Sequence, residues 1–119
     1  MAACPVISDP GIAIYRVIDA AELAYLQMTG NYGSNPSRSG KYFALTFAGA
    51  AAFAAAPMHA GSTITETTVP QSVVRWGFAM IDPGPYGAGR SVYFGEAQLP
   101  IVYRAMTPPV VVAGARRGP

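Results

Sequence analysis

Residues 12–22 read IAIYRVIDAAE and combine a strand pattern with a helix start. From Ile12 to Ile18 apolar residues occupy both alternating faces, which predicts a strand in the interior of a sheet. Asp19 stands three residues before Glu22, the spacing of a capping box, and apolar residues follow up to Gly30, a typical helix terminator. The domain is therefore predicted to start with a central strand that leads directly into a helix.

The rest of the chain is predicted to add further strands and a second helix. In chain order these are a strand over 41–45, an Ala-rich helix over 47–56 after Thr46 and before Pro57, a strand over 62–69, a helical turn over 70–74, and strands over 91–96 and 108–112. Residues 31–40 and 82–89 are rich in Gly, Pro, Ser and Asn and are predicted loops, the first a candidate lid. This order indicates an α+β fold.

Composition favours one globular domain, residues 1–119, with a core over about 12–113 and flexible ends at 1–11 and 114–119. The chain has 119 residues, of which 51% are hydrophobic and 12% charged. Its formal charge is +2 and the basic residues are scattered, so electrostatics do not nominate nucleic acid. One Cys and one His exclude an internal disulfide and a Cys/His zinc cluster, and we expect no metal.

An uncharged run over 42–58 raises the question of a membrane segment. The run is mostly Ala, contains Gly49 and Pro57, and is shorter than the ~20 strongly apolar residues that a membrane span requires. The first ten residues also lack the basic and apolar regions of a signal peptide. We therefore expect no contact with a membrane.

The acidic residues can be sorted by elimination because there are only six. Glu66 and Glu96 each lie on a predicted strand and share its face with apolar residues, where an unpaired carboxylate costs several kcal/mol unless it lines a solvated cleft. An edge-strand carboxylate facing water is the alternative for both, and a salt bridge between Arg16 and a Glu across strands is the alternative for Arg16. The other four have turn or helix-start roles: Asp9, Asp19, Glu22 and Asp82.

Aromatic residues and His59 allow both structural and functional interpretations. His59 follows Pro57 and is expected at a loop or helix end. The strand aromatics fit ordinary core or sheet surface, but beside an Arg and a Glu they would also suit a flat heteroaromatic ring and a phosphate. These aromatics are Tyr15, Tyr42, Phe43, Tyr93 and Phe94.

Several short motifs, taken in order and spacing, resemble a known family. Over residues 14–112 the chain is similar to the small ADP-ribosyltransferase-like toxin domains at the C-terminal ends of bacterial polymorphic and secretion-system effectors. The motifs are Tyr15-Arg16-Val17-Ile18, Ala21-Glu22-Leu23, Thr29-Gly30, Gly40-Lys41-Tyr42-Phe43-Ala44 before an Ala-rich helix, and Val69-Pro70-Gln71-Ser72-Val73-Val74.

The resemblance implies a small split antiparallel β-sheet core with two flanking helices, framing an NAD+ cleft. It implies that Arg16 anchors the NAD+ phosphates or ribose and that Glu96 is the catalytic glutamate. The other residues implied to bind NAD+ are Tyr15, Lys41, Tyr42 and Phe43. The chain departs from the usual pattern: its second strand lacks Ser-Thr-Ser, and Phe94 stands where a Glu or Gln usually precedes the catalytic glutamate.

The implied activity is cleavage of the nicotinamide–ribose bond of NAD+, the substrate, with transfer of ADP-ribose to a protein or nucleic acid. Cleavage builds positive charge on the ribose, so one well-placed carboxylate suffices. NAD+ hydrolysis and a catalytically inactive interaction domain of the same fold are the alternatives. The resemblance also implies a cognate immunity protein as a partner and delivery to the cytoplasm of a target cell.

Overall fold

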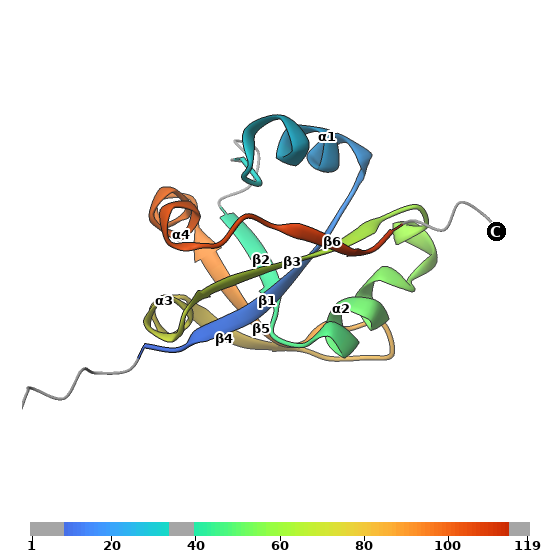
Figure 1. Cartoon of the computed structure of the whole chain (residues 1–119). Coiled ribbons are helices and arrows are strands. Elements are labelled where there is room, and N and C mark those ends of the chain that lie inside the picture. The colour runs from blue at the N-terminus through green and yellow to red at the C-terminus, as the bar shows by residue number, and fades with distance from the viewer. Residues whose placement is uncertain (1–8, 34–39, 115–119) are drawn as a thin grey trace, which may run out of the picture.

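A six-stranded antiparallel sheet with helices packed against it forms the fold (Figure 1). The structure is a computed structural model that describes residues 9–33 and 40–114. The elements are β1 (Gly11–Ile18), α1 (Ala20–Thr29), β2 (Gly40–Ala44), α2 (Phe47–Ala54), the 3₁₀ turn η1 (Pro57–His59), β3 (Thr63–Pro70), α3 (Gln71–Trp76), β4 (Phe78–Asp82), β5 (Gly89–Gly95), α4 (Leu99–Ala105) and β6 (Val110–Ala113). The α+β class is thus confirmed.

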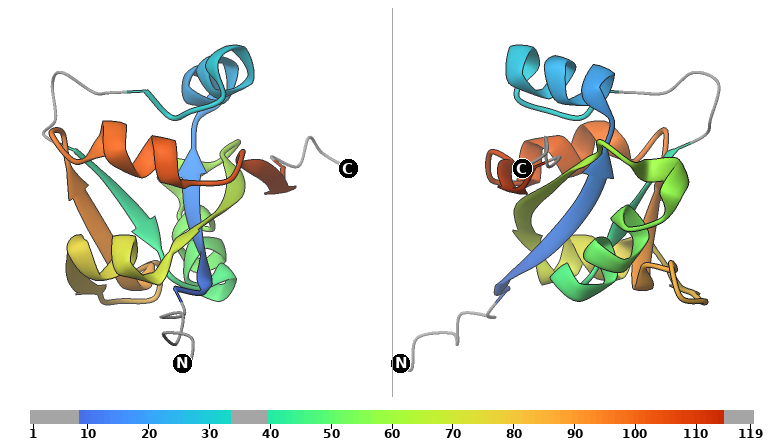
Figure 2. Two further views of the ribbon diagram at one scale, coloured as in Figure 1. Left: turned by 60° about the vertical axis from the view of Figure 1, so that its left-hand side comes forward. Right: turned by 90° about the vertical axis from the view of Figure 1, so that its right-hand side faces the viewer.

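In the sheet order β4-β5-β2-β1-β3-β6, the pairing is weakest in the middle, between β2 and β1. Strand β1 pairs with β3 along its whole length, but it pairs with β2 only at Tyr15 and Ala44. Figure 2 shows β1 and β2 diverging from this point. We call β1, β3 and β6 the first half-sheet, β2, β4 and β5 the second half-sheet, and the line between them the seam. The sheet is therefore split, with β1 in its interior as predicted.

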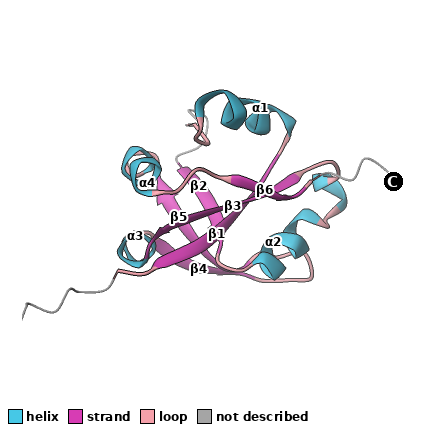
Figure 3. Ribbon diagram, in the orientation of Figure 1, coloured by secondary structure: helices cyan, strands magenta, loops and turns pink. Residues whose placement is uncertain are grey.

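The two faces of the sheet carry two separate hydrophobic clusters. The main core includes Ile14, Phe43 and Phe94 from the strands, together with Leu26 of α1 and Val102 of α4. A smaller cluster, built around Ala44, Ala50 and Ile64, lies under α2. Figure 3 shows α3 and α4 on one side of the sheet and α2 on the other. Each half-sheet is thus held by helices as well as by its strand ladder.

Local caps fix both ends of α1 and the start of α2 where the sequence predicts them. The Asp19 side chain accepts a hydrogen bond from the Glu22 backbone N–H at 2.8 Å, and Gly30 ends α1 with a φ of 84°. Thr46 caps α2 in the same way, accepting from the Gly49 N–H at 2.9 Å. Helix α2 ends at Ala54, two residues before the expected end, because the chain turns there into η1.

The structure corrects several expectations about elements. It has four α-helices among the described residues rather than two, because 71–76 form a full helix and 99–105 form α4. Strand β4 was not expected. The last strand is Val110–Ala113 rather than 108–112, and Glu96 lies in the turn after β5 instead of on the strand. Residues 34–39 of the candidate lid lie outside the described residues.

Candidate functional site

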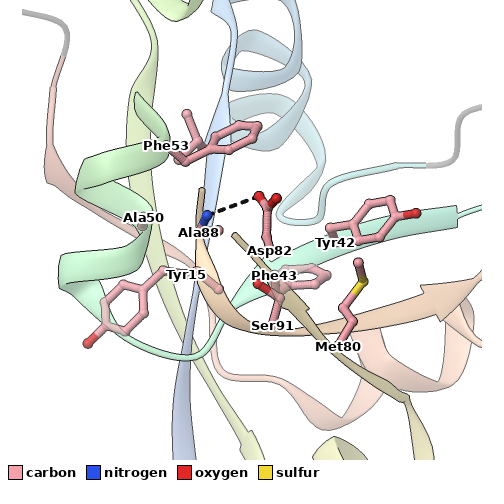
Figure 4. A pocket seen from close by; sticks show the side chains of 11 residues that line it. Tyr15, Tyr42, Phe43, Ala50, Phe53, Met80, Asp82, Ala88 and Ser91 are labelled. Atoms are coloured by element: carbon pink, nitrogen blue, oxygen red, sulfur yellow. Dashed lines mark hydrogen bonds between the residues drawn. The ribbon is translucent and has the colours of Figure 1, made fainter. Parts of the chain in front are cut away.

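A pocket of about 220 Å³ opens beside the seam, on the α2 side of the sheet (Figure 4). We call it the seam pocket. Its one carboxylate, Asp82, accepts a hydrogen bond from the Ala88 N–H at 2.9 Å. Most of the other lining residues are apolar or aromatic. The lining residues come from both half-sheets, α2 and the β4–β5 loop: Tyr15, Val17, Tyr42, Phe43, Ala44, Ala50, Phe53, Met80, Asp82, Ala88 and Ser91.

A second, more polar cavity of about 530 Å³ adjoins the seam pocket. We call it the polar pocket. Val17 and Phe53 line both cavities, which are therefore neighbours, and we call the two together the groove. The polar side chains along the wall of the polar pocket are Arg16, Asp19, Glu22, His59 and Ser62. The groove thus has an apolar part and a polar part, as a site for an amphipathic ligand requires.

Arg16, Glu22 and Lys41 form a charge cluster where the half-sheets part. Arg16 Nε donates to Glu22 Oε2 at 2.5 Å and Arg16 Nη2 donates to Glu22 Oε1 at 3.0 Å. Lys41 Nζ lies 3.7 Å from the same Oε1. Arg16 Nη1 donates to the Tyr42 carbonyl at 3.0 Å, so the guanidinium bonds to the β2 backbone where β1 no longer pairs with it. Within residues 9–33 and 40–114, three of its five N–H groups have hydrogen-bond acceptors and two do not.

Burial shifts the pKa values of Lys41 and Tyr32 near this cluster. Lys41 is 4% exposed, and its burial together with the Arg16 charge lowers the pKa of its ammonium group, which Glu22 and Glu96 partly oppose. Burial raises the pKa of Tyr32 to about 12, and the Tyr32 hydroxyl lies 2.7 Å from Thr65 Oγ1. The Arg16 guanidinium lies 6.0 Å from the Tyr32 ring centre and 5.9 Å from that of Phe43.

Glu96 occupies a different hollow from the groove. It lines a cavity of about 460 Å³ together with Tyr25, Tyr103 and Arg104 among others. One of its carboxylate oxygens, Oε1, is buried and has no hydrogen-bond partner among the described residues. The charge of Glu96 acts weakly on Lys41, raising its pKa.

The six residues expected at the site are thus only partly brought together. Tyr15, Tyr42 and Phe43 line the seam pocket, and Arg16 lines the polar pocket. Lys41 is buried against Glu22, and Glu96 faces its own hollow.

Some acidic residues have partners that the sequence did not indicate. The Glu22 backbone has the expected helix-start role, but its side chain binds Arg16 and Lys41. Arg16 therefore has a glutamate partner from α1 rather than from a neighbouring strand. Glu66 accepts a hydrogen bond from the Tyr15 hydroxyl at 2.8 Å. Glu66 lies on β3, which is between β1 and β6 in the sheet, so the edge-strand interpretation of Glu66 is wrong.

His59 and Phe53 are further groove residues that sequence reasoning missed. His59 does lie at a helix end, as expected, because it closes η1. Residues of α1 and β1 line the same cavity as His59, and no local pattern around His59 indicates that they come together.

Comparisons with known proteins give no relative for this chain: no family model, curated protein or solved structure matches it. Within residues 9–33 and 40–114, no group of three His, Cys, Asp or Glu side chains could hold a metal ion. The helices in that part of the chain are all too short or too polar to cross a membrane.

Proposed function

We propose that this chain is an NAD+-consuming toxin domain of the ADP-ribosyltransferase type. The observation that carries the proposal is the groove at the seam, where an apolar pocket with two tyrosines adjoins a polar pocket that contains Arg16. NAD+ has the matching chemistry, a flat nicotinamide ring joined to a ribose and a pyrophosphate. In this proposal the ring lies in the seam pocket near Tyr42, and the remaining N–H groups of Arg16 bind a ribose of the dinucleotide.

The reaction needs a carboxylate close to the nicotinamide ribose. As the nicotinamide–ribose bond breaks, positive charge develops on the sugar, and a fixed negative charge stabilises that transition state. Glu96 remains our predicted catalytic residue, and its Oε1 has no hydrogen-bond partner among the described residues. Because this atom is buried and Glu96 lines a cavity outside the groove, the role requires the carboxylate to turn towards the bound ribose. Glu22 is the competing candidate because it lines the polar pocket itself, although both of its oxygens already contact cations.

The second substrate decides whether the reaction is transfer or hydrolysis. We favour transfer of ADP-ribose to a protein or nucleic acid in the cytoplasm of a target cell, with an immunity protein blocking the domain in the producing cell. Phe94 is fully buried in the main core, so it supports packing and cannot contact an acceptor. Water as the acceptor would make the domain an NAD+ glycohydrolase.

The test is incubation of the purified domain with NAD+, first alone and then with cell extract. Free nicotinamide is quantified by chromatography, and labelled ADP-ribose is followed into protein and nucleic acid fractions. We expect nicotinamide release in both conditions and macromolecular label in the second. Absence of nicotinamide release from the folded domain under every acceptor condition would overturn the proposal and favour the inactive interaction domain.

A further inference from the structure

His59 is held in the wall of the polar pocket by two contacts with Phe53. Its ring stacks on Phe53, with the ring centres 4.2 Å apart and an interplanar angle of 26°. His59 Nδ1 lies 2.8 Å from the Phe53 carbonyl oxygen. Because a carbonyl oxygen can only accept, Nδ1 must carry the proton of this bond. In the neutral ring the other nitrogen, Nε2, is then an acceptor, and no described residue bonds to it.

The charges around the pocket indicate what His59 could bind. The Arg16 guanidinium is paired with Glu22, and Asp19 adds a second carboxylate that caps α1. Lys41 also lies 3.7 Å from Glu22, so two cations and two carboxylates leave this wall with little net charge, which suits a sugar better than a multiply charged anion. The wall offers carboxylate and imidazole acceptors, N–H donors from Arg16 and the Ser62 hydroxyl. Neighbouring hydroxyl groups, each both donor and acceptor, match this set best.

We propose that the polar pocket binds a ribose of the dinucleotide and that His59 Nε2 accepts a hydrogen bond from one of its hydroxyls. Phe53 lines both pockets and would then contact the ligand where it passes from one pocket to the other. The cavity volume of about 530 Å³ is within the range of small-molecule sites. This inference rests on the proposed function, because it takes the ligand to be NAD+ or its product ADP-ribose.

The test measures the affinity of the intact chain for ADP-ribose by calorimetry, with a panel of ADP-ribose analogues that each lack one ribose hydroxyl. His59→Phe keeps an aromatic ring on Phe53 but removes Nε2. We expect it to weaken ADP-ribose binding by about 3- to 10-fold, the value of one hydrogen bond. One analogue should bind wild type and His59→Phe equally. His59→Gln, which can place an acceptor near the Nε2 position, should recover part of the affinity.

Two controls make the result decisive. Met28→Leu changes a side chain on α1 that is 80% exposed and outside both pockets, and it should bind like wild type. If His59→Phe does not fold, His59→Asn replaces it, because its amide can still donate to the Phe53 carbonyl while no acceptor stands at Nε2. Equal ADP-ribose affinity of wild type and the variant would overturn the role of His59 alone. No binding of NAD+ or ADP-ribose to wild type would instead overturn the proposed function.

Discussion

At the residue scale, Arg16 joins the fold to the proposed site. Its guanidinium neutralises Glu22 and bonds to the Tyr42 carbonyl, so one side chain connects β1, α1 and β2. A charge on a strand that also carries three isoleucines is costly to bury unless it is paired. The sequence therefore indicated that Arg16 needs a partner, but it could not identify Glu22, because that contact depends on how α1 packs.

The catalytic assignment predicts different outcomes for two glutamates. Glu96→Gln should lower NAD+ turnover by roughly 10²- to 10³-fold, because it removes a charge that acts mainly in the transition state, while NAD+ affinity changes less. Glu66→Gln should retain most turnover, since the amide oxygen can still accept from the Tyr15 hydroxyl. Nicotinamide release by the folded variants is the measurement.

Undiminished turnover in Glu96→Gln would remove Glu96 from the mechanism. If Glu22→Gln then lost turnover while remaining folded, the catalytic role would move to the polar pocket.

The raised pKa of Tyr32 predicts how the free energy of unfolding responds to alkaline pH. Its pKa is about 12 in the folded chain and about 10 in the unfolded chain, so the unfolded state loses its proton first. Stability contributed by this group is complete below pH 10 and falls as the pH rises towards 12, by about 2 to 3 kcal/mol in full. Raised pKa values of Tyr15 and Tyr103 act in the same direction, and the lowered pKa of Lys41 acts against them.

Urea unfolding of wild type and Tyr32→Phe at pH 9 to 11.5 measures this effect. We expect the free energy of unfolding to fall less steeply with pH in the variant. Parallel pH profiles for the two proteins would contradict the assignment.

At the element scale, Gly49 shows tertiary packing overriding helix propensity. Replacing Gly by Ala inside a helix normally stabilises it by about 1 kcal/mol. A Cβ at position 49 would lie 2.0 Å from the Ala88 carbonyl oxygen, so α2 packs directly against the β4–β5 loop there.

We therefore expect Gly49→Ala to lower the free energy of unfolding by at least 1 kcal/mol, measured by urea denaturation. Ala48→Gly, one position earlier on an exposed site of the same helix, should cost only the usual 0.5 to 1 kcal/mol or so. A stabilised Gly49→Ala variant would show that the loop can move away from α2.

Elements were predictable from the sequence where the signal is local, and not elsewhere. Strands β1 and β3 have alternation or β-branched runs, and α1 has a cap and a terminator. Strand β4 lies at the sheet edge with Phe78 and Ile81 exposed, so its residues carry no buried-face pattern. Helix α4 has no cap or apolar-period signal that marks it, and it contains Pro100, which is tolerated only in the first turn of a helix.

At the scale of the whole molecule, the seam divides the sheet into two half-sheets, and the candidate site lies beside this seam. Both pockets combine residues from segments far apart in sequence, so no local motif could have shown which of them meet. The relative placement of the half-sheets decides that Tyr15 and Tyr42 share one pocket while Glu96 faces another.

A ligand across the seam should change the dynamics of the strands beside it. We expect saturating NAD+ to slow amide hydrogen exchange in β1 and β2, because the groove lies between them, and to leave β6 unchanged at the far edge. Mass spectrometry of peptides from these strands provides the measurement, with β6 as the internal reference. Protection spread evenly over all six strands would indicate general stabilisation rather than binding in the groove.

The two half-sheets are interleaved along the chain, and this decides when the sheet can be completed during synthesis. A ribosome makes the strands in numerical order, so the second half-sheet lacks a member until β5 ends at Gly95, and the first until β6 ends at Ala113. No contiguous fragment contains one half-sheet without strands of the other. The six-stranded sheet can therefore be completed only after β6, which ends at Ala113, has left the ribosomal exit tunnel.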